Sequence, residues 1–197
     1  CSANSRLYVE RSVKDALVEK LIARAQATQP GDPLDPASRM GAIVDEKQTE
    51  GIMRFVEAGT ITANLVAGGK RIRIDGKGCF VQPTIFDDVG QDDPLARDEI
   101  FGPVLSVIAF DTEAEAVAMA NDSIYGLAAS VWTDNLSRAC RVADKLHVGT
   151  VSVNTVDALS AQTPFGGMKQ SGFGRDLSMH SLEKYTALKT TWIKYRS

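Results

Sequence analysis

The fold of this chain is decided by residues 104–154, which read VLSVIAFDTEAEAVAMANDSIYGLAASVWTDNLSRACRVADKLHVGTVSVN. Three short apolar runs in this stretch, VLSVIAF, AASVWT and TVSVN, read as strands, and two segments with helical periodicity separate them. Thr112 with Glu115 three residues later is a capping pair that opens the first of these helices. Strands and helices alternating in this order predict a parallel sheet with right-handed crossovers and helices on its faces.

The chain before this stretch begins with a short predicted strand, and a helix is predicted over residues 12–28. Ser12 and Asp15 match an S-x-x-D cap at its start, and its apolar residues recur on one face. Residues 29–39 contain three prolines and a glycine, so they form an irregular surface connection. This connection separates elements of one domain.

A second helix is predicted to begin at the capping pair Asp45 and Gln48 and to end at Gly59. Residues 63–89 contain short β-rich pieces separated by glycine-rich turns, which indicate hairpins or edge strands. The chain ends in a predicted strand, within residues 187–197, for which the sequence offers no partner. An unpaired strand of this kind invites pairing with a second subunit.

Composition excludes several classes of function. The chain has 197 residues, a formal charge of -3 and no basic block, so nucleic acid is not an expected partner. No apolar run reaches the roughly 20 residues that span a bilayer, and no leader sequence is recognised, so we expect a cytoplasmic protein without a membrane partner.

The cysteines and histidines do not form a metal or disulfide pattern. Cys1, Cys79 and Cys140 are widely spaced and lack a CxxC motif, and His147 and His180 are the only histidines. We therefore expect reduced thiols and no metal site. Cys79 is expected to pack in the β-rich region, and Cys140 shares the apolar face of a helix, so it is expected in the core.

Three positions are candidates for a site, and each also has a purely structural reading. Cys1 is a thiol ahead of a strand, so it is either a nucleophile or an ordinary residue at the point where the sequence starts. Asn154 ends a strand and Glu99 lies in a sharp EIFGP turn; ligands of such sheets gather at the carboxyl ends of strands. Asn154 could instead tie a turn, and Glu99 could be a solvated charge. The glycines of PFGGMKQSGFGR do not follow the G-x-G-x-x-G spacing of a dinucleotide fingerprint.

Five motifs together resemble a known family: CSANSRLYV, EIFGPVLSVIAF, NDSIYGLAASVWT, GTVSVNT and TPFGGMKQSGFGRD. Their order and spacing are similar to the catalytic half of the NAD(P)-dependent aldehyde dehydrogenase superfamily, and the match covers essentially the whole chain. The C-terminal part most resembles bacterial enzymes that oxidise gamma-glutamylamino- or guanidino-butyraldehydes. The resemblance implies a three-layer α/β catalytic domain over residues 1–186 and an oligomerisation strand over 187–197, in a homodimer or homotetramer.

The resemblance also implies roles for the nucleophile and for the cofactor site. Cys1 matches the cysteine whose thiolate attacks the aldehyde to give a thiohemiacetal and then a thioester. Glu99 matches the glutamate that holds the nicotinamide ribose of NAD or NADP, and Phe101 matches the aromatic residue beside it. Gln48 falls near a position that reaches the other ribose, and its capping role remains an equally good interpretation.

Asp157, Leu159 and Phe165 fall where the family lines its substrate tunnel, and the substrate is expected to be a small-molecule aldehyde of the amino-aldehyde class. In relatives the cofactor domain, the general-base glutamate and an oxyanion-hole asparagine precede the cysteine, so we expect the 197-residue chain alone to be inactive. Two alternatives stay open: a non-catalytic assembly module, and an amidohydrolase with Cys1 as an N-terminal nucleophile. The second requires stacked antiparallel sheets, which the alternating pattern disfavours.

Overall fold

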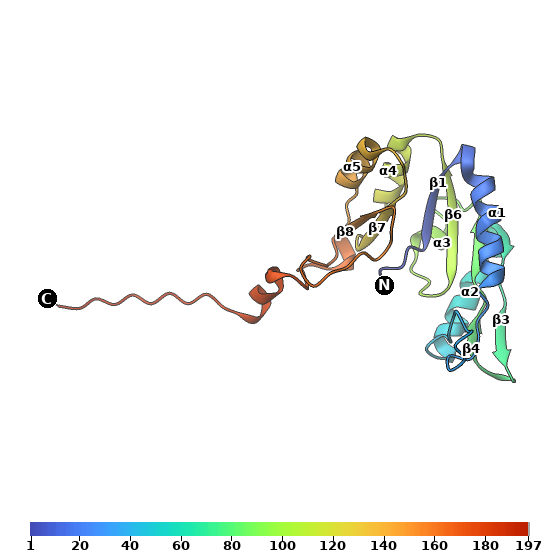
Figure 1. The fold of residues 1–197 in the computed structure, drawn as a ribbon, viewed down its shortest axis with the longest axis horizontal. Coiled ribbons are helices and arrows are strands. Elements are labelled where there is room, and N and C mark those ends of the chain that lie inside the picture. The colour runs from blue at the N-terminus through green and yellow to red at the C-terminus, as the bar shows by residue number, and fades with distance from the viewer. Residues whose placement is uncertain (197) are drawn as a thin grey trace. The chain divides into compact units, whose positions relative to one another are not determined.

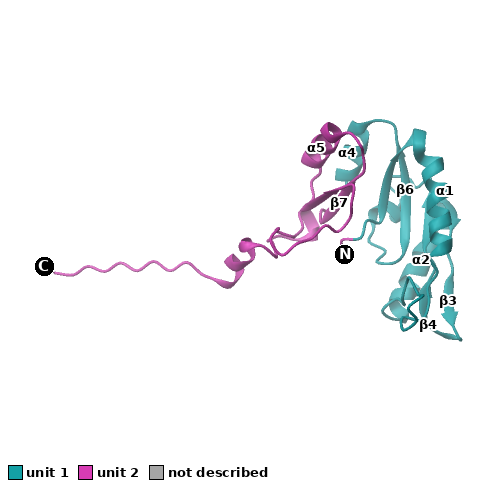
Figure 2. Ribbon diagram, viewed as in Figure 1, with its two compact units in different colours: residues 1, 3–123 teal, residues 2, 124–197 magenta. Residues whose placement is uncertain are grey.

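The structure is a computed structural model that describes residues 1–196. It divides into two compact units, each of which is described by itself (Figure 2). The first unit contains Cys1 and Ala3–Ser123, and the second contains Ser2 and the residues from Ile124 onward. Within residues 1–196, no helix has the length and apolar character needed to cross a bilayer.

The first unit is built on a four-stranded sheet with the order β1-β6-β5-β2 (Figure 1). Its strands are β1 (Arg6–Glu10), β6 (Val104–Phe110), β5 (Thr84–Asp87) and β2 (Asn64–Ala67). β6 lies between β1 and β5 and runs parallel to both, whereas β2 is antiparallel to β5. The parallel pairing around β6 confirms the α/β class predicted from the sequence.

Helices cover both faces of this sheet. α1 (Arg11–Ala27) packs on one face, and the other face carries α2 (Glu46–Thr62), α3 (Pro94–Arg97) and α4 (Glu113–Asn121). A hairpin of β3 (Arg71–Ile74) and β4 (Lys77–Val81) lies against α2. The first unit therefore has three layers, in the order helix, sheet, helices.

Alternation along the strands builds the core of these layers, because successive side chains of a strand point to opposite faces. Ile85 and Val107 pack with α1, while Phe86 and Ile108, the next residues of the same strands, pack with α2 and α3. All four side chains are buried. Burial on both faces explains why VLSVIAF is apolar without a clear alternation.

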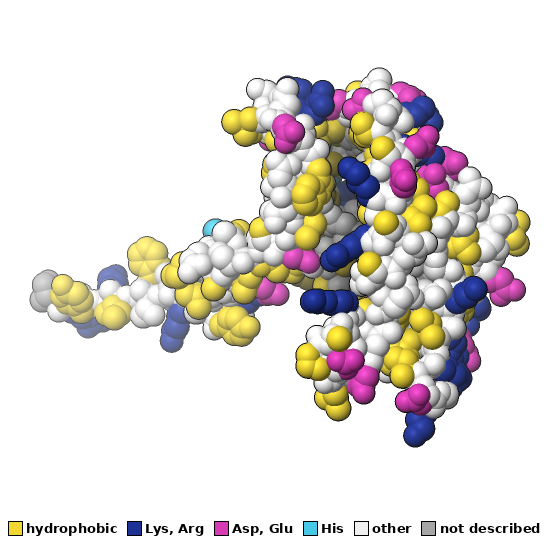
Figure 3. Space-filling view, turned by 45° about the vertical axis from the view of Figure 1, so that its right-hand side comes forward, with side chains coloured by type: hydrophobic (Ala, Val, Ile, Leu, Met, Phe, Trp, Pro, Cys, Tyr) yellow, Lys and Arg dark blue, Asp and Glu magenta, His cyan; other side chains and the backbone are white. Residues whose placement is uncertain are grey.

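The second unit contains a parallel strand, helix, strand element made of β7 (Ala128–Val131), α5 (Leu136–Lys145) and β8 (Thr150–Val153). Two short 3-10 helices follow, at Lys169–Ser171 and Met179–Tyr185. Residues 186–196 form neither helix nor strand and run as an extended segment (Figure 1). Figure 3 shows hydrophobic side chains in yellow along this segment. Four large apolar residues of it are exposed: Leu188, Trp192, Ile193 and Tyr195. The predicted pairing of 187–197 with a second subunit stays a prediction.

The strand pairing differs from the prediction that residues 104–154 form one sheet. β6 belongs to the four-stranded sheet, and β7 with β8 forms a separate two-stranded sheet. Both edges of β6 are already paired, one with β1 and one with β5, so β7 has no free edge of β6 to join.

Two of the predicted helix caps are confirmed and two helix boundaries were wrong. The side chain of Asp45 accepts from the Gln48 amide at 2.7 Å, and that of Thr112 accepts from the Glu115 amide at 3.2 Å. Ser12 does not cap α1; the helix begins one residue earlier, and the Ser12 hydroxyl donates to the Glu10 carboxylate. Gly59 does not end α2, which continues to Thr62.

One of the two internal cysteines does not pack as predicted. Cys140 is exposed, which overturns its expected place in the core, because α5 buries Ala139 instead. Cys79 is partly exposed, and its thiol lies 3.4 Å from the Glu46 carboxylate. Both are free thiols.

Candidate functional site

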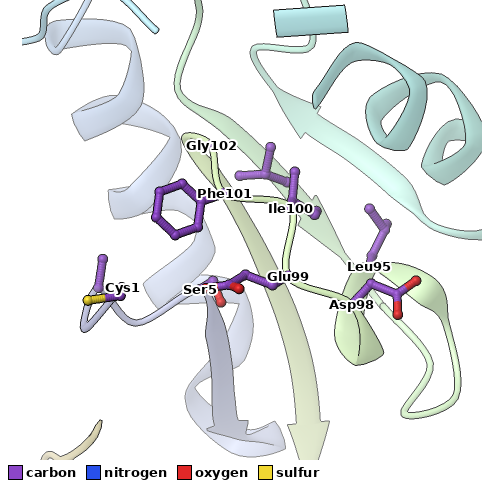
Figure 4. Close-up of a pocket in the computed structure, with 10 residues that line it drawn as sticks. Cys1, Ser5, Leu95, Asp98, Glu99, Ile100, Phe101 and Gly102 are labelled. Carbon is purple, nitrogen blue, oxygen red and sulfur yellow. The ribbon is translucent and has the colours of Figure 1, made fainter. Parts of the chain in front are cut away.

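The first unit contains a shallow pocket of about 170 Å³ that brings together three of the predicted site residues: Cys1, Glu99 and Phe101. Figure 4 shows the Cys1 side chain and the Phe101 ring on the same side of the loop that carries Phe101. Phe101 is 61% exposed, and Glu99 is exposed as well. The pocket therefore offers a thiol, a carboxylate and an aromatic face to one small volume.

The pocket lies at the amino ends of strands, whereas the sequence had suggested their carboxyl ends. β1 and β6 are parallel and in register from Arg6 opposite Ser106, so the residues that precede the two strands lie next to each other. Cys1 precedes β1, and Glu99 and Phe101 precede β6. The carboxyl-end rule describes sites built by the loops that follow strands, and this pocket is built by segments that enter them.

The segment from Asp98 to Pro103, called here the pocket loop, connects α3 to β6 and is packed onto α2. Ile100 is partly buried and packs against the core cluster that contains Ile52. A Cβ atom at Gly102 would lie 2.6 Å from two carbon atoms of Ile52, so the absence of a side chain allows the loop to approach the helix. The contacts of Ile100 and Gly102 with α2 and its core cluster therefore hold the loop in place, while Phe101 stays exposed.

Gln48 is held to this loop through its side chain. Its Nε2 atom donates to the carbonyl oxygen of Ile100 at 3.0 Å and to that of Phe101 at 3.1 Å. Phe101 has φ of 54°, in the left-handed region that glycine adopts more easily than other residues. Gln48 thus reaches the predicted cofactor site through the backbone of its loop. Its backbone amide also donates to the Asp45 side chain, which is the capping contact predicted from the sequence.

Arg97, at the end of α3, anchors the start of the pocket loop, and sequence reasoning missed it. Its guanidinium donates to the Asp122 carbonyl at 2.6 Å and to the carboxylates of Asp122 and Asp92 at 2.7 and 2.6 Å. These hydrogen bonds, to Asp122 first and Asp92 second, raise the pKa of Arg97. An arginine flanked by acidic residues is common on surfaces, so no local signal marked it.

The partly buried Tyr8 ties β1 to the helical layer near this anchor. The Tyr8 hydroxyl donates to the Met119 carbonyl at 3.2 Å, at the end of α4, and burial raises the pKa of Tyr8. Gln91 donates to the same carbonyl at 3.0 Å. Side chains from separate elements therefore satisfy carbonyls that the helix end leaves without an intrahelical partner.

The predicted substrate residues all lie in the second unit. Asp157 and Leu159 are exposed and belong to one turn, in which the Leu159 amide donates to the Asp157 carbonyl at 2.9 Å. Phe165 is partly buried and forms an isolated antiparallel bridge with Asp176. The Asn154 side chain exchanges two hydrogen bonds with the backbone of Thr133, at 2.9 and 3.0 Å, which supports its structural reading.

Metal ligands do not gather within the described part of the chain. Across residues 1–196, no group of three or more His, Cys, Asp or Glu side chains is arranged to hold a metal ion.

Comparison with known proteins identifies the family. A sequence model of the aldehyde dehydrogenase family matches residues 1–191. The chain therefore belongs to the aldehyde dehydrogenase family.

Individual relatives agree with this assignment. A betaine aldehyde dehydrogenase from Rhizobium etli is 46% identical over 98% of this chain. The crystal structure of a gamma-glutamyl-gamma-aminobutyraldehyde dehydrogenase from Burkholderia cenocepacia is 55% identical, with a TM-score of 0.91 over 95% of this chain and 38% of that one. An indole-3-acetaldehyde dehydrogenase from P. syringae, in complex with NAD+ and IAA, is 52% identical, with a TM-score of 0.93 over 97% of this chain and 39% of that one. The chain spans 40% of the length of the Rhizobium enzyme.

Proposed function

We propose that Cys1 is the nucleophile of an NAD(P)-dependent aldehyde dehydrogenase and that the pocket around it is part of the active site. The observation that carries this proposal is the meeting of Cys1, Glu99 and Phe101 in one pocket of a chain that belongs to the aldehyde dehydrogenase family. Separate stretches of sequence supply these residues, and the β1 to β6 pairing joins them.

The residues of the pocket fit the nicotinamide end of a dinucleotide. Glu99 presents an exposed carboxylate that can accept hydrogen bonds from ribose hydroxyls, and the exposed Phe101 ring can pack beside a planar ring. At about 170 Å³ the pocket is smaller than the roughly 300–1,000 Å³ of ligand sites, so other parts of the protein must complete the cofactor site. NAD(P)+, when bound, supplies the acceptor for a hydride.

Cys1 carries the covalent steps in this proposal. Its thiolate adds to the carbonyl carbon of the aldehyde and forms a carbon–sulfur bond, which gives a thiohemiacetal. Oxidation of this adduct leaves the acyl group on Cys1 as a thioester. Water then attacks the acyl carbon, the carbon–sulfur bond breaks, and the acid leaves while the thiolate is restored. Sulfur suits both roles because it adds readily to carbonyls and departs as a stable anion.

The test is a set of cysteine variants in the protein expressed from its complete reading frame. We expect Cys1→Ser to lower kcat for NADH formation by at least about a thousandfold, as expected when a nucleophile is lost. Cys79→Ser and Cys140→Ser are matched controls that should keep the activity within about twofold. A Cys1→Ser variant that still turns over aldehyde would refute the assignment of the nucleophile. The 197-residue chain alone should give no turnover, because its pocket encloses too little of the cofactor.

We further propose an amino-aldehyde as the substrate class. The support is the activity by which similar proteins are named, betaine aldehyde dehydrogenase and gamma-glutamyl-gamma-aminobutyraldehyde dehydrogenase, together with the exposed carboxylate of Asp157. With Leu159 and Phe165, Asp157 is assigned to the wall of the substrate site. An exposed carboxylate contributes only a modest attraction to an ammonium group.

Asp157→Asn should therefore lower kcat/KM for a cationic amino-aldehyde by about two- to fivefold. The value for a neutral aldehyde of equal length should stay unchanged. Asp134→Asn removes the same charge elsewhere in the second unit and serves as the control. Equal losses for both aldehydes would contradict a charge-recognition role for Asp157.

The alternative of an assembly module is favoured by one observation, the exposed apolar side chains of residues 188–195. Size measurement in solution tests it, and a strictly monomeric protein would argue against it. The three-layer first unit does not have the stacked antiparallel sheets of an N-terminal-nucleophile amidohydrolase, so that alternative is not retained. The homodimer or homotetramer and the cytoplasmic location stay predictions.

A further inference from the structure

We propose that Gln48 is a positioning residue that holds Phe101 in its left-handed conformation and so presents the Phe101 ring and Glu99 to the cofactor. In this assignment Gln48 acts through the backbone of the pocket loop and does not bind the second ribose. The inference rests on the proposed function of the pocket, and it assigns to Gln48 a different role from the one that the family resemblance implies.

The first argument is the conformation of Phe101. A φ of 54° brings the Cβ atom of an L-residue close to its own backbone, so the conformation persists only where the surroundings impose it. Packing of the side chain cannot impose it, because Phe101 is 61% exposed. The support must therefore come from the backbone on either side of Phe101.

The second argument is where the Gln48 amide points. Its Nε2 donates to the carbonyls of Ile100 and Phe101, which are the carbonyls immediately before and after the φ and ψ bonds of Phe101. One planar amide group thus fixes both ends of the strained residue. The orientation of the amide follows from chemistry, because two carbonyl oxygens can face the NH₂ group but not the oxygen of the side chain.

The third argument is that the remaining contacts fix the loop on both sides of Phe101 but leave the Phe101 ring itself exposed. Ile100 packs into the core and Gly102 lies against Ile52, so the chain is anchored before and after the exposed ring. Gln48 also holds still, because its backbone amide is capped by Asp45 in the first turn of α2. Gln48 therefore adds to these packing contacts the two hydrogen bonds that join α2 directly to the backbone of Phe101.

This arrangement makes a prediction that a direct contact with the cofactor does not make. The Gln48 Nε2 atom already donates to two loop carbonyls, so its oxygen is the atom left to accept a hydrogen bond from a ribose hydroxyl. Gln48→Glu keeps an acceptor of the same shape but loses both donors and sets a carboxylate against two carbonyl oxygens. The positioning role is lost in this variant, whereas a ribose acceptor would be retained.

The experiment measures NAD+ binding by calorimetry in the protein from its complete reading frame, and kcat and KM in parallel. We expect Gln48→Ala to raise the Kd for NAD+ by about tenfold, the effect of losing two modest hydrogen bonds. Gln48→Glu should raise it at least as much. Lys47→Gln, the exposed neighbour on α2, changes the net charge by the same amount as Gln48→Glu and should stay within about twofold.

A second background tests the dependence on Phe101. Glycine adopts a left-handed conformation without strain, so in a Phe101→Gly protein the change Gln48→Ala should alter the Kd for NAD+ by less than about twofold. The urea midpoint of the cofactor-free protein provides a separate readout. Gln48→Ala should lower this midpoint in the wild-type background and hardly change it in the Phe101→Gly background.

The outcomes separate this inference from the proposed function. Wild-type affinity of Gln48→Glu for NAD+, or an equal effect of Gln48→Ala in both backgrounds, would overturn the positioning role. A wild-type protein that does not bind NAD+ would refute the proposed function, and the urea midpoints would still decide whether Gln48 holds Phe101.

Discussion

Gly102→Ala should destabilise the protein through a single methyl group, because the pocket loop touches α2 at this residue. The φ of Gly102 is not positive, so alanine meets no backbone strain and should even gain about 0.4–1 kcal/mol from the stiffer unfolded chain. The new Cβ, however, would lie 2.6 Å from both Cδ1 and Cγ1 of Ile52, which is fully buried. Overpacking of this kind costs about 1–3 kcal/mol, so the net loss should be about 1–2 kcal/mol.

Equilibrium urea unfolding measures this loss, and Gly90→Ala is the matched control. A Cβ at Gly90 meets nothing within 4 Å, and its φ is not positive either, so that variant should be as stable as the wild type or slightly more stable. Because the pocket loop must shift to make room, Gly102→Ala should also weaken NAD+ binding, and Gly90→Ala should not.

A second substitution tests whether the Ile52 side chain is the group that clashes with the new Cβ atom of Gly102→Ala. Ile52→Val alone removes a buried methyl group and should cost about 0.5–1.5 kcal/mol. In the Gly102→Ala background the same change clears the Cδ1 atom from the crowded space, so the double variant should lose less stability than the sum of the two single losses. Wild-type stability of Gly102→Ala, or strict additivity with Ile52→Val, would refute the reasoning.

Two further predictions concern ion pairs of the first unit. Lys14 is buried and contacts Asp87 at 2.9 Å, so Lys14→Met should cost about 3–5 kcal/mol in urea unfolding by leaving a buried carboxylate unpaired, and Asp87→Asn added to it should recover part of that loss. The hydrogen bond from Arg71 lowers the pKa of Glu46 from 4.5 to about 2, so this pair stabilises the fold above pH about 4.5 and the contribution disappears as the pH falls toward 2. The difference in urea midpoint between wild type and Arg71→Met should therefore be constant near neutral pH and shrink below pH about 4.5; a difference that grows in acid would contradict the assignment.

Local sequence signals were sufficient for the elements that depend on local contacts. The caps at Asp45 and Thr112 form because each side chain needs only an amide three residues away. Gly59 was misread as a helix end for the opposite reason. A Cβ there would lie 2.7 Å from Leu95, a residue far away in sequence, so the glycine serves helix packing and not termination.

The position of α5 residues shows a similar limit. Periodicity placed Cys140 on an apolar face, but a face becomes core only where another element covers it. In the second unit, α5 buries Ala139 and leaves Cys140 exposed. The pattern therefore predicted a helix correctly and the buried side of that helix wrongly.

The residues that line the candidate site were predicted from motifs, but the residues that hold the pocket loop in place were not. Cys1, Glu99 and Phe101 stand in motifs that resemble a family, and the structure brings them into one pocket. Gln48 was read as a cap or as a ribose ligand because the contact with the pocket loop spans more than fifty residues of sequence. Long-range hydrogen bonds between side chain and backbone leave no periodicity or spacing in the sequence, and so Arg97 was missed as well.

The pocket depends on the pairing of β1 with β6 more than on any single residue within it. Ser106 connects the two: its amide donates to the Ser5 carbonyl at 3.0 Å, and its hydroxyl donates to the Leu95 carbonyl at 2.8 Å. One buried residue therefore fixes the segment that enters β1 and the helix that precedes the pocket loop. A shift of one residue in this register would turn the side chains of β1 to the opposite face and move Cys1 away from Glu99 and Phe101. The chemistry proposed for Cys1 therefore depends on the register of β1 with β6, which places Cys1 beside the pocket loop that Gln48 holds.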